Sequence, residues 1–413
     1  MYLPKRPGDN LDPLMALGAT DMGLVGRLPL FDAVFSNTQG VDLKDVVLIG
    51  VQHLLPTTRL FLRHLVEHGL QPQNVYLLGK CYSTIPWVYN ALQSDGFNVS
   101  PLSFKFDSGR PFDSTFRSAV HSFIKSINFK RISASNRCIV LDDGGALISN
   151  LLLEHTNLDN VSAVEQTSSG YRAIKDLSFK IPIINVARAE AKLAYESPFI
   201  AKAIVSSVFN RLYHHRIYQI KRAIVIGCGP IGREVARHIG SHTEILLYDH
   251  DPSISLVDTS DLNRALPSSD LVIGCTGSNS LSEAQIAMLQ SPAVLASGSS
   301  SDREFNASAL RRRALRSRDC HTDIRLHDGP LLLNSGFPIN FTGQREIENR
   351  NHIQLTRCLL AAGIFQALRL DGAVTGIVTL DTAFQQLIIN NFLGSAVSMA
   401  SHIDHLAPTG AIL

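Results

Sequence analysis

Short apolar runs along the chain alternate with stretches whose apolar residues recur at helical spacing. Residues 45–51 form the first strand-like run, and residues 57–68 follow with helical spacing. The same order recurs in the strand-like run 74–79, the helical stretch 87–92 and a third strand-like run, 138–145. Because buried strands alternate with helices, the pattern predicts an α/β fold with a parallel sheet.

A second set of elements follows the strand-like run 181–186. A helical stretch over 189–218 leads to new apolar runs, and those at 270–277 and 293–298 end in small residues. Strand ends of this kind face the cofactor crevice of doubly wound sheets. From residue 343 to about 405 the sequence predicts helices. Residues 1–40 predict irregular structure with one short helix near 11–17, because Pro, Gly and Asn interrupt them.

A glycine motif lies at the centre of this second set. An apolar run ends at Gly227, Gly229 and Gly232 follow, and helical spacing then begins. This order is typical of a dinucleotide-binding turn, in which the glycines allow the turn, the approach of a pyrophosphate and close helix packing. A second apolar run ends in Asp249, close to the ~20-residue spacing of the motif. Asp249 would accept both ribose hydroxyls of NAD and repel a 2′-phosphate, so the sequence predicts NAD.

The alternative is a glycine-rich strand-to-helix turn followed by an exposed aspartate. If the turn does bind NAD, Pro230 and Ile231 are further candidates for cofactor contact, since they begin the helix that faces the phosphates.

Composition limits the remaining classes. The 413 residues, 45% of them hydrophobic, predict a soluble globular protein of two or three domains. A net charge of +2 with 18% charged residues gives no reason to expect a nucleic-acid partner, and the basic run 311–318 is interpreted as a solvated helix face. The six cysteines have no zinc spacing, so no metal site is expected. They are expected to be free thiols in a reducing compartment. No apolar stretch approaches the ~18 residues of a membrane span, which predicts a cytoplasmic protein without a membrane partner.

Several motifs follow one another along the chain: Gly50–His53, Val140–Gly145, Val164–Gly170, Ile184–Val186 with Lys192, the glycine motif, Asp249–Pro252, and Thr276 with Gly277. In their order and spacing they resemble the S-adenosylhomocysteine hydrolase family over roughly residues 45–365. The resemblance implies a parallel-sheet substrate domain (1–195), an inserted Rossmann NAD-binding domain (196–342), and C-terminal helices that return to the substrate domain (343–413). It also implies a nucleoside substrate and a homo-oligomer, a dimer or tetramer.

The family's chemistry assigns expected catalytic roles. Such enzymes use NAD to oxidise the 3′-hydroxyl of a nucleoside, eliminate the 5′ group, add water and return the hydride. The catalytic lysine falls on Lys192, with Glu196 at the family's following aspartate. The acid/base positions near the 5′ carbon fall on Asp143 and His53. The alternatives are a surface lysine, an aspartate that caps a turn, and a hydrogen-bonded histidine at a strand end.

The resemblance also implies further cofactor contacts. Hydroxyl residues stand at the three positions of the family's threonine triplet. Thr276 and Asn334 match its adenosine and nicotinamide contacts, and Gly277 adjoins Thr276. The alternative for the triplet is an ordinary turn or helix cap. The positions implied are Thr167, Ser168, Ser169, Thr276, Gly277 and Asn334.

The chain departs from the family where the family recognises its substrate. Leu55 and Thr57 stand in place of the threonine and glutamate that hold adenine, so adenine recognition is expected to be poor. Two histidines of the family are replaced by other residue types, and the C-terminal tail that reaches a neighbour's NAD has no counterpart. The candidate substrate contacts are Thr57, Thr58, Gln166, Ser299 and Phe337.

Three functions remain open at this point. The first is an NAD-dependent enzyme that applies the family's oxidise, eliminate and reduce cycle to a different nucleoside or nucleoside thioether. The second is an ordinary adenosylhomocysteinase with altered contacts. The third is a non-catalytic NAD- or nucleoside-binding protein.

Overall fold

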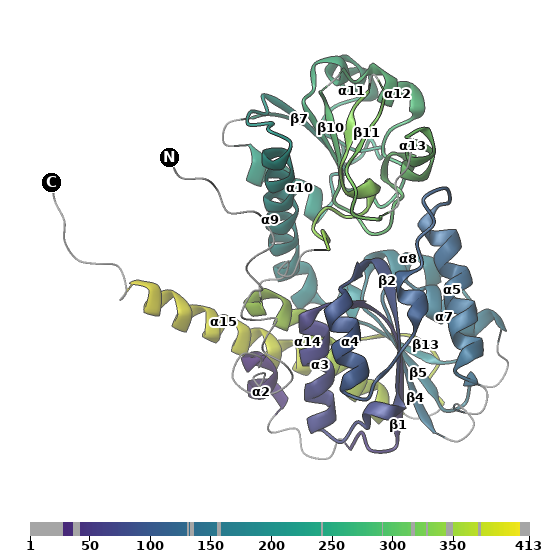
Figure 1. Cartoon of the computed structure of the whole chain (residues 1–413). Coiled ribbons are helices and arrows are strands. Elements are labelled where there is room, and N and C mark those ends of the chain that lie inside the picture. The colour runs from purple at the N-terminus through teal and green to yellow at the C-terminus, as the bar shows by residue number, and fades with distance from the viewer. Residues whose placement is uncertain are drawn as a thin grey trace, which may run out of the picture.

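The computed structural model describes residues 28–35, 42–129, 132, 136–154, 158–240, 243–290, 292–314, 319–327, 329–343, 350–370 and 373–404. Two units, each built on its own sheet, make up this part of the chain (Figure 1). The helix predicted near residues 11–17 lies outside the described residues. Within them, no helix is long and apolar enough to cross a bilayer.

The first unit contains a seven-stranded sheet in the order β13-β6-β5-β4-β1-β2-β3, and all its pairings are parallel. Its strands are β1 (Val46–Leu54), β2 (Val75–Thr84), β3 (Asn98–Val99), β4 (Arg137–Asp142), β5 (Val161–Glu165), β6 (Pro182–Asn185) and β13 (Gly376–Thr379). Its helices are α2 (Pro29–Phe35), α3 (Pro56–Glu67), α4 (Pro86–Ser94), α5 (Phe112–Ser126), α7 (Ala146–Glu154), α8 (Ser168–Ile174), α14 (Arg350–Arg369) and α15 (Thr382–Asp404).

Helices cover both faces of this sheet, which explains why its strands are continuous apolar runs. Along β1, Val46 and Leu48 join the core with α3, α4 and α14, whereas Val47, Ile49 and Val51 join the core with α5 and α7. Side chains of a strand alternate between the two faces, so an apolar residue is needed at each position. Parallel strands also bring their carboxyl ends to one edge of the sheet, where the candidate residues of β1, β4 and β5 lie.

The second unit contains a six-stranded sheet in the order β11-β12-β10-β9-β7-β8. The pairings are parallel except that of β11 with β12. Strands and helices alternate here too, which gives a Rossmann-type unit inserted between β6 and β13 of the first sheet. Its elements are β7 (Arg222–Ile226), α10 (Pro230–Ile239), β8 (Glu244–Tyr248), α11 (Thr259–Ala265), β9 (Leu271–Gly274), α12 (Glu283–Met288), β10 (Val294–Ser297), α13 (Ala307–Arg313), β11 (Ile324–Arg325) and β12 (Leu331–Leu332).

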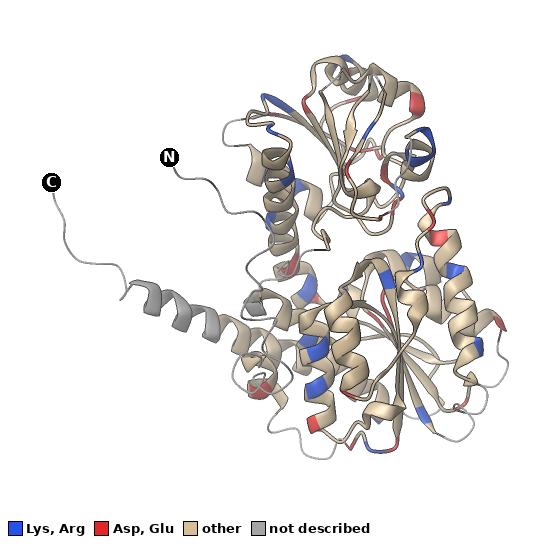
Figure 2. Cartoon of the chain, in the orientation of Figure 1, with Lys and Arg blue, Asp and Glu red and all other residues tan. Residues whose placement is uncertain are grey.

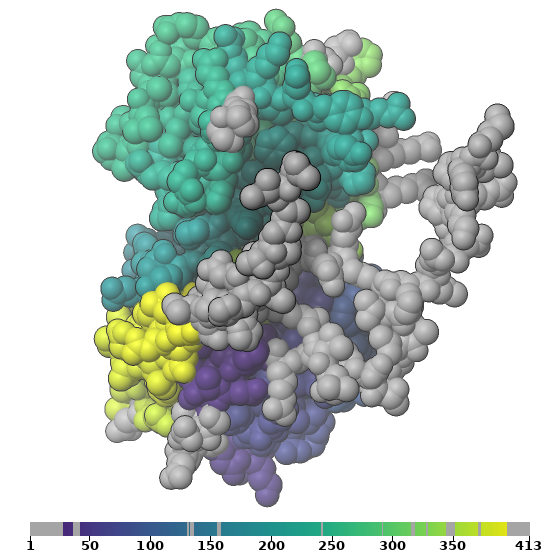
Figure 3. All heavy atoms as spheres, turned by 90° about the vertical axis from the view of Figure 1, so that its left-hand side faces the viewer, coloured from purple at the N-terminus to yellow at the C-terminus, as the bar shows by residue number. Residues whose placement is uncertain are grey.

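One long helix, α9 (Glu190–His214), belongs to both units. Ala191 packs into the core of the first unit, whereas Ala201, Ile204 and Val208 pack against the second sheet. In the space-filling view the second unit rests on the first, with α9 and α15 on the face toward the viewer (Figure 3). Short 3-10 helices complete the chain: η1 (Pro72–Asn74), η2 (Pro101–Phe104), η3 (Val186–Arg188), η4 (Leu266–Ser268), η5 (Glu304–Asn306) and η6 (Leu333–Gly336).

The predicted α/β class with parallel sheets is confirmed, and two details of the sequence interpretation are wrong. The segment after residue 343 is not purely helical, because β13 adds an edge strand to the first sheet by pairing with β6. The basic run 311–318 is not simply a solvated helix face, because the side chain of Arg311 is buried. Residues 315–318 lie outside the described residues. Elsewhere Lys, Arg, Asp and Glu residues are spread over both units (Figure 2).

Arg311 and Asp302 form a buried ion pair that joins the two units. Arg311 donates to Asp302 at 2.6 Å and also to the carbonyls of Ser108 and Arg110, which precede α5 in the first unit. Asp302 accepts in addition from the backbone N–H of Phe112. The pair therefore holds the 108–112 segment of the first unit against the end of β10.

Replacing Arg311 by methionine is expected to destabilise the protein by about 3–5 kcal/mol, because it leaves the Asp302 carboxylate buried without its cation. Chemical denaturation monitored by circular dichroism measures the change. Arg313→Met is the matched control, since Arg313 pairs with Glu283 at the surface and its loss is expected to cost about 1 kcal/mol or less. Equal destabilisation by the two variants would contradict the importance of the buried pair.

Candidate functional site

The glycine motif forms the turn between β7 and α10. Gly227 has a φ of +116°, and a Cβ there would lie 2.7 Å from the carbonyl oxygen of Cys275. A Cβ at Gly232 would lie 1.8 Å from the carbonyl oxygen of Gly227, so the helix packs against the turn itself. A Cβ at Gly229 would meet nothing within 4 Å, so the backbone there is open to a ligand. This is the arrangement that a bound pyrophosphate requires.

Asp249 follows β8 and lies against the same turn. Its Oδ2 accepts from the backbone N–H of Cys228 at 2.6 Å, and its Oδ1 accepts from the N–H of Asp251 at 2.9 Å. Each oxygen keeps a further lone pair, so the half-buried carboxylate can accept from ribose hydroxyls. The residues of this turn therefore fit a dinucleotide. Pro230 is the first residue of α10, and Ile231 follows it there.

The opposite wall of the crevice is held by Glu304, a residue that the sequence interpretation missed. Its buried carboxylate accepts from the backbone N–H groups of Thr276 and Gly277 and from the Ser299 hydroxyl at 2.7–2.8 Å. Burial raises the pKa of Glu304. Ser299, predicted to contact substrate, thus supports the wall that carries Thr276 and Gly277. Sequence alone offers no signal for Glu304, because nothing in its neighbourhood indicates burial.

In the first unit, the ends of β1, β2, β4 and β5 bring five polar side chains together. The carboxylate of Asp143 accepts from Lys80 Nζ and from Gln166 Nε2. His53 Nε2 lies 3.3 Å from Asp143 Oδ2, and His53 Nδ1 lies 2.5 Å from Ser83 Oγ. His53, Asp143 and Gln166 were predicted to act in the site, whereas Lys80 and Ser83 were not.

The electrostatics of this cluster fix which groups carry charge. Burial lowers the pKa of His53 to about 3, which leaves the imidazole neutral at physiological pH. Burial alone would raise the pKa of Asp143, but the charge and hydrogen bond of Lys80, together with other neighbouring groups such as Lys192, outweigh it and hold that pKa well below its usual range. Although burial opposes a charged amine, Asp143 in turn raises the pKa of Lys80. Asp143 is therefore an anion that can only accept hydrogen bonds.

Two neighbouring carboxyl groups behave in the opposite way. Burial raises the pKa of Asp142 to about 7, and burial together with the charge of Asp142 raises the pKa of Glu165 well above its usual value. Asp142 accepts from the N–H of Ile148, and Glu165 accepts from the N–H and hydroxyl of Thr167. Asp142 therefore accepts from the first turn of α7, and Glu165 holds Thr167, the residue that caps α8.

The predicted hydroxyl triplet lies at the start of α8. Thr167 is the N-cap of this helix and accepts from the N–H of Gly170 at 2.9 Å. Ser169 Oγ lies 3.5 Å from Thr167 Oγ1, and Ser168 is exposed. The cap interpretation thus describes Thr167 in this structure. Cofactor contact by the triplet stays a prediction.

Lys192 lies near the start of α9, on the first-unit side. Its Nζ is 3.0 Å from Glu196 Oε1, which also accepts from the Thr356 hydroxyl at 2.7 Å. The charge of Lys192 is among the causes that lower the pKa of both His53 and Asp143. Lys192 is therefore within electrostatic reach of the His53 cluster.

Thr57 and Thr58 begin α3, and both are buried. Their hydroxyls accept from Arg357 of α14 at 3.2 and 2.9 Å, and the Thr58 hydroxyl donates to the carbonyl of His53. Arg357 was not found from the sequence, because it lies some 300 residues from the threonines that it contacts. A guanidinium only donates hydrogen bonds, so this part of the site differs in kind from a carboxylate that accepts from adenine.

Phe337 and Asn334 lie inside the interface between the units. Phe337 is fully buried and stacks on Tyr82 of β2, with ring centroids 4.9 Å apart. The Asn334 amide donates to the carbonyls of Pro338 and Phe341 at 2.9 Å and accepts from His321. In this arrangement both residues hold the 337–341 segment, so contact with substrate or nicotinamide would require that segment to move.

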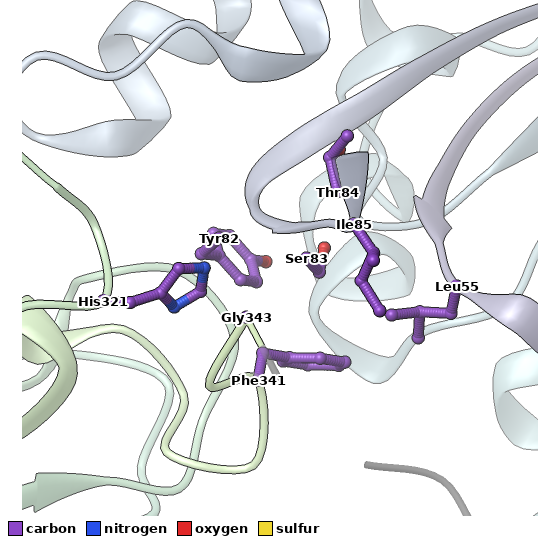
Figure 4. Close-up of a pocket in the computed structure, with 8 residues that line it drawn as sticks. All are labelled: Leu55, Tyr82, Ser83, Thr84, Ile85, His321, Phe341 and Gly343. Carbon is purple, nitrogen blue, oxygen red and sulfur yellow. The ribbon is translucent and has the colours of Figure 1, made fainter. Parts of the chain in front are cut away.

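A small hollow lies where the two units meet (Figure 4). Leu55 and residues 82–85 line it from the first unit, and His321, Phe341 and Gly343 line it from the second. The Phe341 ring also stacks on His53, with centroids 4.5 Å apart. The predicted acid/base histidine therefore lies directly at the junction of the units.

The comparison with curated proteins decides the family. The uncharacterized protein Rv0104 of Mycobacterium tuberculosis (strain ATCC 25618 / H37Rv) is 38% identical over 351 residues, which cover 83% of this chain and 68% of that protein. This chain belongs to the same family. Another member, the uncharacterized protein MT0113 of M. tuberculosis (strain CDC 1551 / Oshkosh), matches with the same identity and coverage. No family model matches the chain.

Solved structures give weaker similarities. Dipicolinate synthase from Bacillus halodurans is 11% identical, covers 80% of this chain and 100% of its own, and has a TM-score of 0.39. NAD⁺-bound 3-phosphoglycerate dehydrogenase of Entamoeba histolytica is 10% identical, covers 61% of this chain and 71% of its own, and has a TM-score of 0.32. These values carry no inference about activity. None of these comparisons points to adenosylhomocysteinase.

Replacing Asp142 by asparagine should change the pH dependence of stability. The carboxyl has a pKa of about 7 in the folded protein and ~3.9 in the unfolded chain, so the folded state holds more protons between these values. The Asp142 carboxyl therefore makes its full contribution to the free energy of unfolding below the pKa of the unfolded chain. This contribution decreases as the pH rises toward 7, by at most about 1.4 kcal/mol per pH unit. Asparagine is neutral and still accepts from Ile148.

The free energy of unfolding of Asp142→Asn, relative to the native chain, is therefore expected to increase from pH 4 to pH 7. Urea denaturation over this range measures it. Asp176→Asn, at an exposed position, is the control and should follow the native chain. A constant difference between Asp142→Asn and the native chain would contradict a protonated Asp142.

Proposed function

We propose that the protein is an NAD-dependent enzyme that oxidises a hydroxyl group of a nucleoside or nucleoside thioether and then uses acid/base groups for elimination, addition and re-reduction. The observation that carries the proposal is that each unit holds one of two complementary sets of groups. The second unit has a Rossmann turn open to a pyrophosphate, and the first unit has His53 and Asp143 in contact, within electrostatic reach of Lys192.

The second unit supports the choice of cofactor. The backbone at Gly229 is open, and α10 begins at the next residue, so its free N–H groups face the position of a pyrophosphate. Asp249 offers two carboxylate oxygens beside this turn. NAD, when bound, supplies a hydride acceptor that can later return the hydride.

The first unit supports the proton transfers. Lys192 is oriented by Glu196, and its neutral amine form would take the proton of the hydroxyl group that is oxidised. The neutral imidazole of His53 can act as a base, and the ionised carboxylate of Asp143 orients it and stabilises its protonated form. Burial at the junction excludes water, which strengthens these interactions.

An ordinary adenosylhomocysteinase remains the second candidate, and Arg357 makes it less favoured. The buried guanidinium beside Thr57 and Thr58 provides donors where recognition of adenine's exocyclic amine would need an acceptor. The third candidate, a non-catalytic binding protein, is favoured by Ser299, which is engaged by Glu304 and cannot replace the proton-transferring histidine expected from the resemblance.

Asp249 is expected to select NAD over NADP, because its carboxylate would lie against a 2′-phosphate. Titration of the native chain with both cofactors, followed by intrinsic fluorescence, should give much weaker binding of NADP. Asp249→Asn removes the charge and should narrow the difference, whereas Asp251→Asn, two residues away and exposed, should preserve it. Equal binding of both cofactors by the native chain would remove the basis of the assignment.

Lys192→Ala is expected to leave folding and NAD binding intact and to lower the rate of cofactor reduction by ~10²–10⁴-fold, since a positioned proton acceptor is lost. The measurement is the rise in absorbance of NADH when a panel of nucleosides is added to the NAD-loaded protein. Lys202→Ala, at an exposed position of the same helix, is the matched control. Native turnover by Lys192→Ala would favour a different mechanism, and no reduction by the native chain would favour the non-catalytic candidate.

A further inference from the structure

Both ring nitrogens of His53 are engaged by the protein. Nε2 lies 3.3 Å from Asp143 Oδ2, and Nδ1 lies 2.5 Å from Ser83 Oγ. Phe341 stacks on the ring at an interplanar angle of 23°, which covers one face of the imidazole. A ligand in the hollow therefore has no direct in-plane path to either nitrogen, and any proton that His53 exchanges with the ligand must pass through a neighbouring group.

The charges in the cluster fix the role of each ring nitrogen, in the ion-pair contact with Asp143 and in the hydrogen bond with Ser83. Asp143 is ionised and can only accept, so the proton of the neutral imidazole is on Nε2 and points to the carboxylate. Nδ1 then carries the lone pair and accepts the hydrogen of the Ser83 hydroxyl. Lys80 keeps this arrangement in place, because its charge holds Asp143 in the ionised form.

Ser83 lines the hollow (Figure 4), whereas His53 is not among the residues that line it. Ser83 is the next-to-last residue of β2, beside Thr84 at the edge where the two units meet. Among the described residues, the side-chain oxygen of Ser83 has one hydrogen-bond partner, His53. The oxygen therefore retains lone pairs that can accept a proton from a ligand on the hollow side.

We propose that Ser83 is a catalytic residue that relays a proton between the substrate and His53. In the forward step the bond between the substrate and its proton breaks, and the electron pair stays on the substrate. Ser83 Oγ gains that proton and gives its own to His53 Nδ1, so the hydroxyl is restored and the imidazolium pairs with Asp143. The return step reverses each transfer, and no oxidant or reductant is consumed by the relay. The proposal rests on the proposed function and adds the group that contacts the substrate; Lys80 is a positioning residue in it.

The first test is the tautomer of His53, which needs no substrate. Nitrogen-15 NMR of the full chain with labelled histidine, assigned with His53→Gln, should place the proton on Nε2 and give Nδ1 the shift of a hydrogen-bonded acceptor. Ser83→Ala should move the Nδ1 signal and leave Nε2–H unchanged. A proton on Nδ1 in the native chain would overturn the relay whatever the substrate is.

The second test separates the relay from the oxidation step. With NAD and the most active nucleoside of a panel in D₂O, Ser83→Ala should still form NADH but should exchange the substrate's carbon-bound proton for deuterium ~10²–10⁴-fold more slowly. Ser83→Thr keeps the hydroxyl and should recover most of the exchange. Native exchange by Ser83→Ala, or covalent labelling of Ser83 by a fluorophosphonate, would overturn the relay, the latter in favour of a nucleophile. If the native chain forms no NADH with any nucleoside, the proposed function fails, and the tautomer measurement alone decides whether the Ser83–His53 hydrogen bond has the direction that the relay needs.

Discussion

The buried ion pair between Lys80 and Asp143 is the interaction on which the candidate site depends. Three carboxyl groups, those of Asp142, Asp143 and Glu165, end adjacent parallel strands and are withdrawn from water. Burial alone favours the neutral form of each. For Asp143 alone, Lys80 and the other neighbouring groups together reverse this preference, and the resulting single anion fixes the orientation of His53 and accepts from the Gln166 amide. The site therefore has one defined anion, Asp143, and not three carboxyl groups that share protons.

The junction of the units is closed by contacts of two kinds. The aromatic rings of Tyr82 and His53 stack on Phe337 and Phe341 from the second unit, and the Arg311–Asp302 pair holds the segment before α5. The rings remove water from the neighbourhood of His53, while the ion pair fixes how the two surfaces meet. Because electrostatic interactions grow stronger where water is absent, the same closure that joins the units sharpens the chemistry between them.

Local signals made much of this arrangement predictable from the sequence. The glycine turn, Asp249 and the strand-like runs depend on neighbouring residues, so the α/β class and the Rossmann turn followed directly. The roles of four other residues could not be predicted, because each acts through a contact with a residue far away in the chain. These residues are Lys80, Ser83, Glu304 and Arg357.

Two further differences between the sequence interpretation and the structure also arise from contacts between residues that are distant in the chain. The strand β13 was missed because its pairing with β6 crosses the whole inserted unit. Arg311 was interpreted as solvated because a basic run gives no sign of the carboxylate and the carbonyls that it meets in the folded protein. Predicted substrate contacts at Thr57, Thr58, Ser299 and Phe337 lie on elements that reach the junction, yet their side chains are engaged by the protein itself.

The insertion of one unit into the other bears on how the chain folds during synthesis. The helix α14 supplies Leu355, Leu359 and Phe365 to the core of the first sheet, and β13 completes its edge. Both emerge from the ribosome only after the entire Rossmann-type unit. The inserted unit is continuous from β7 to β12 and can fold as soon as it appears, whereas the earlier strands must wait with an unfinished core. The nascent first sheet is therefore exposed for the time needed to make the second unit, and a chaperone would be most useful in that interval.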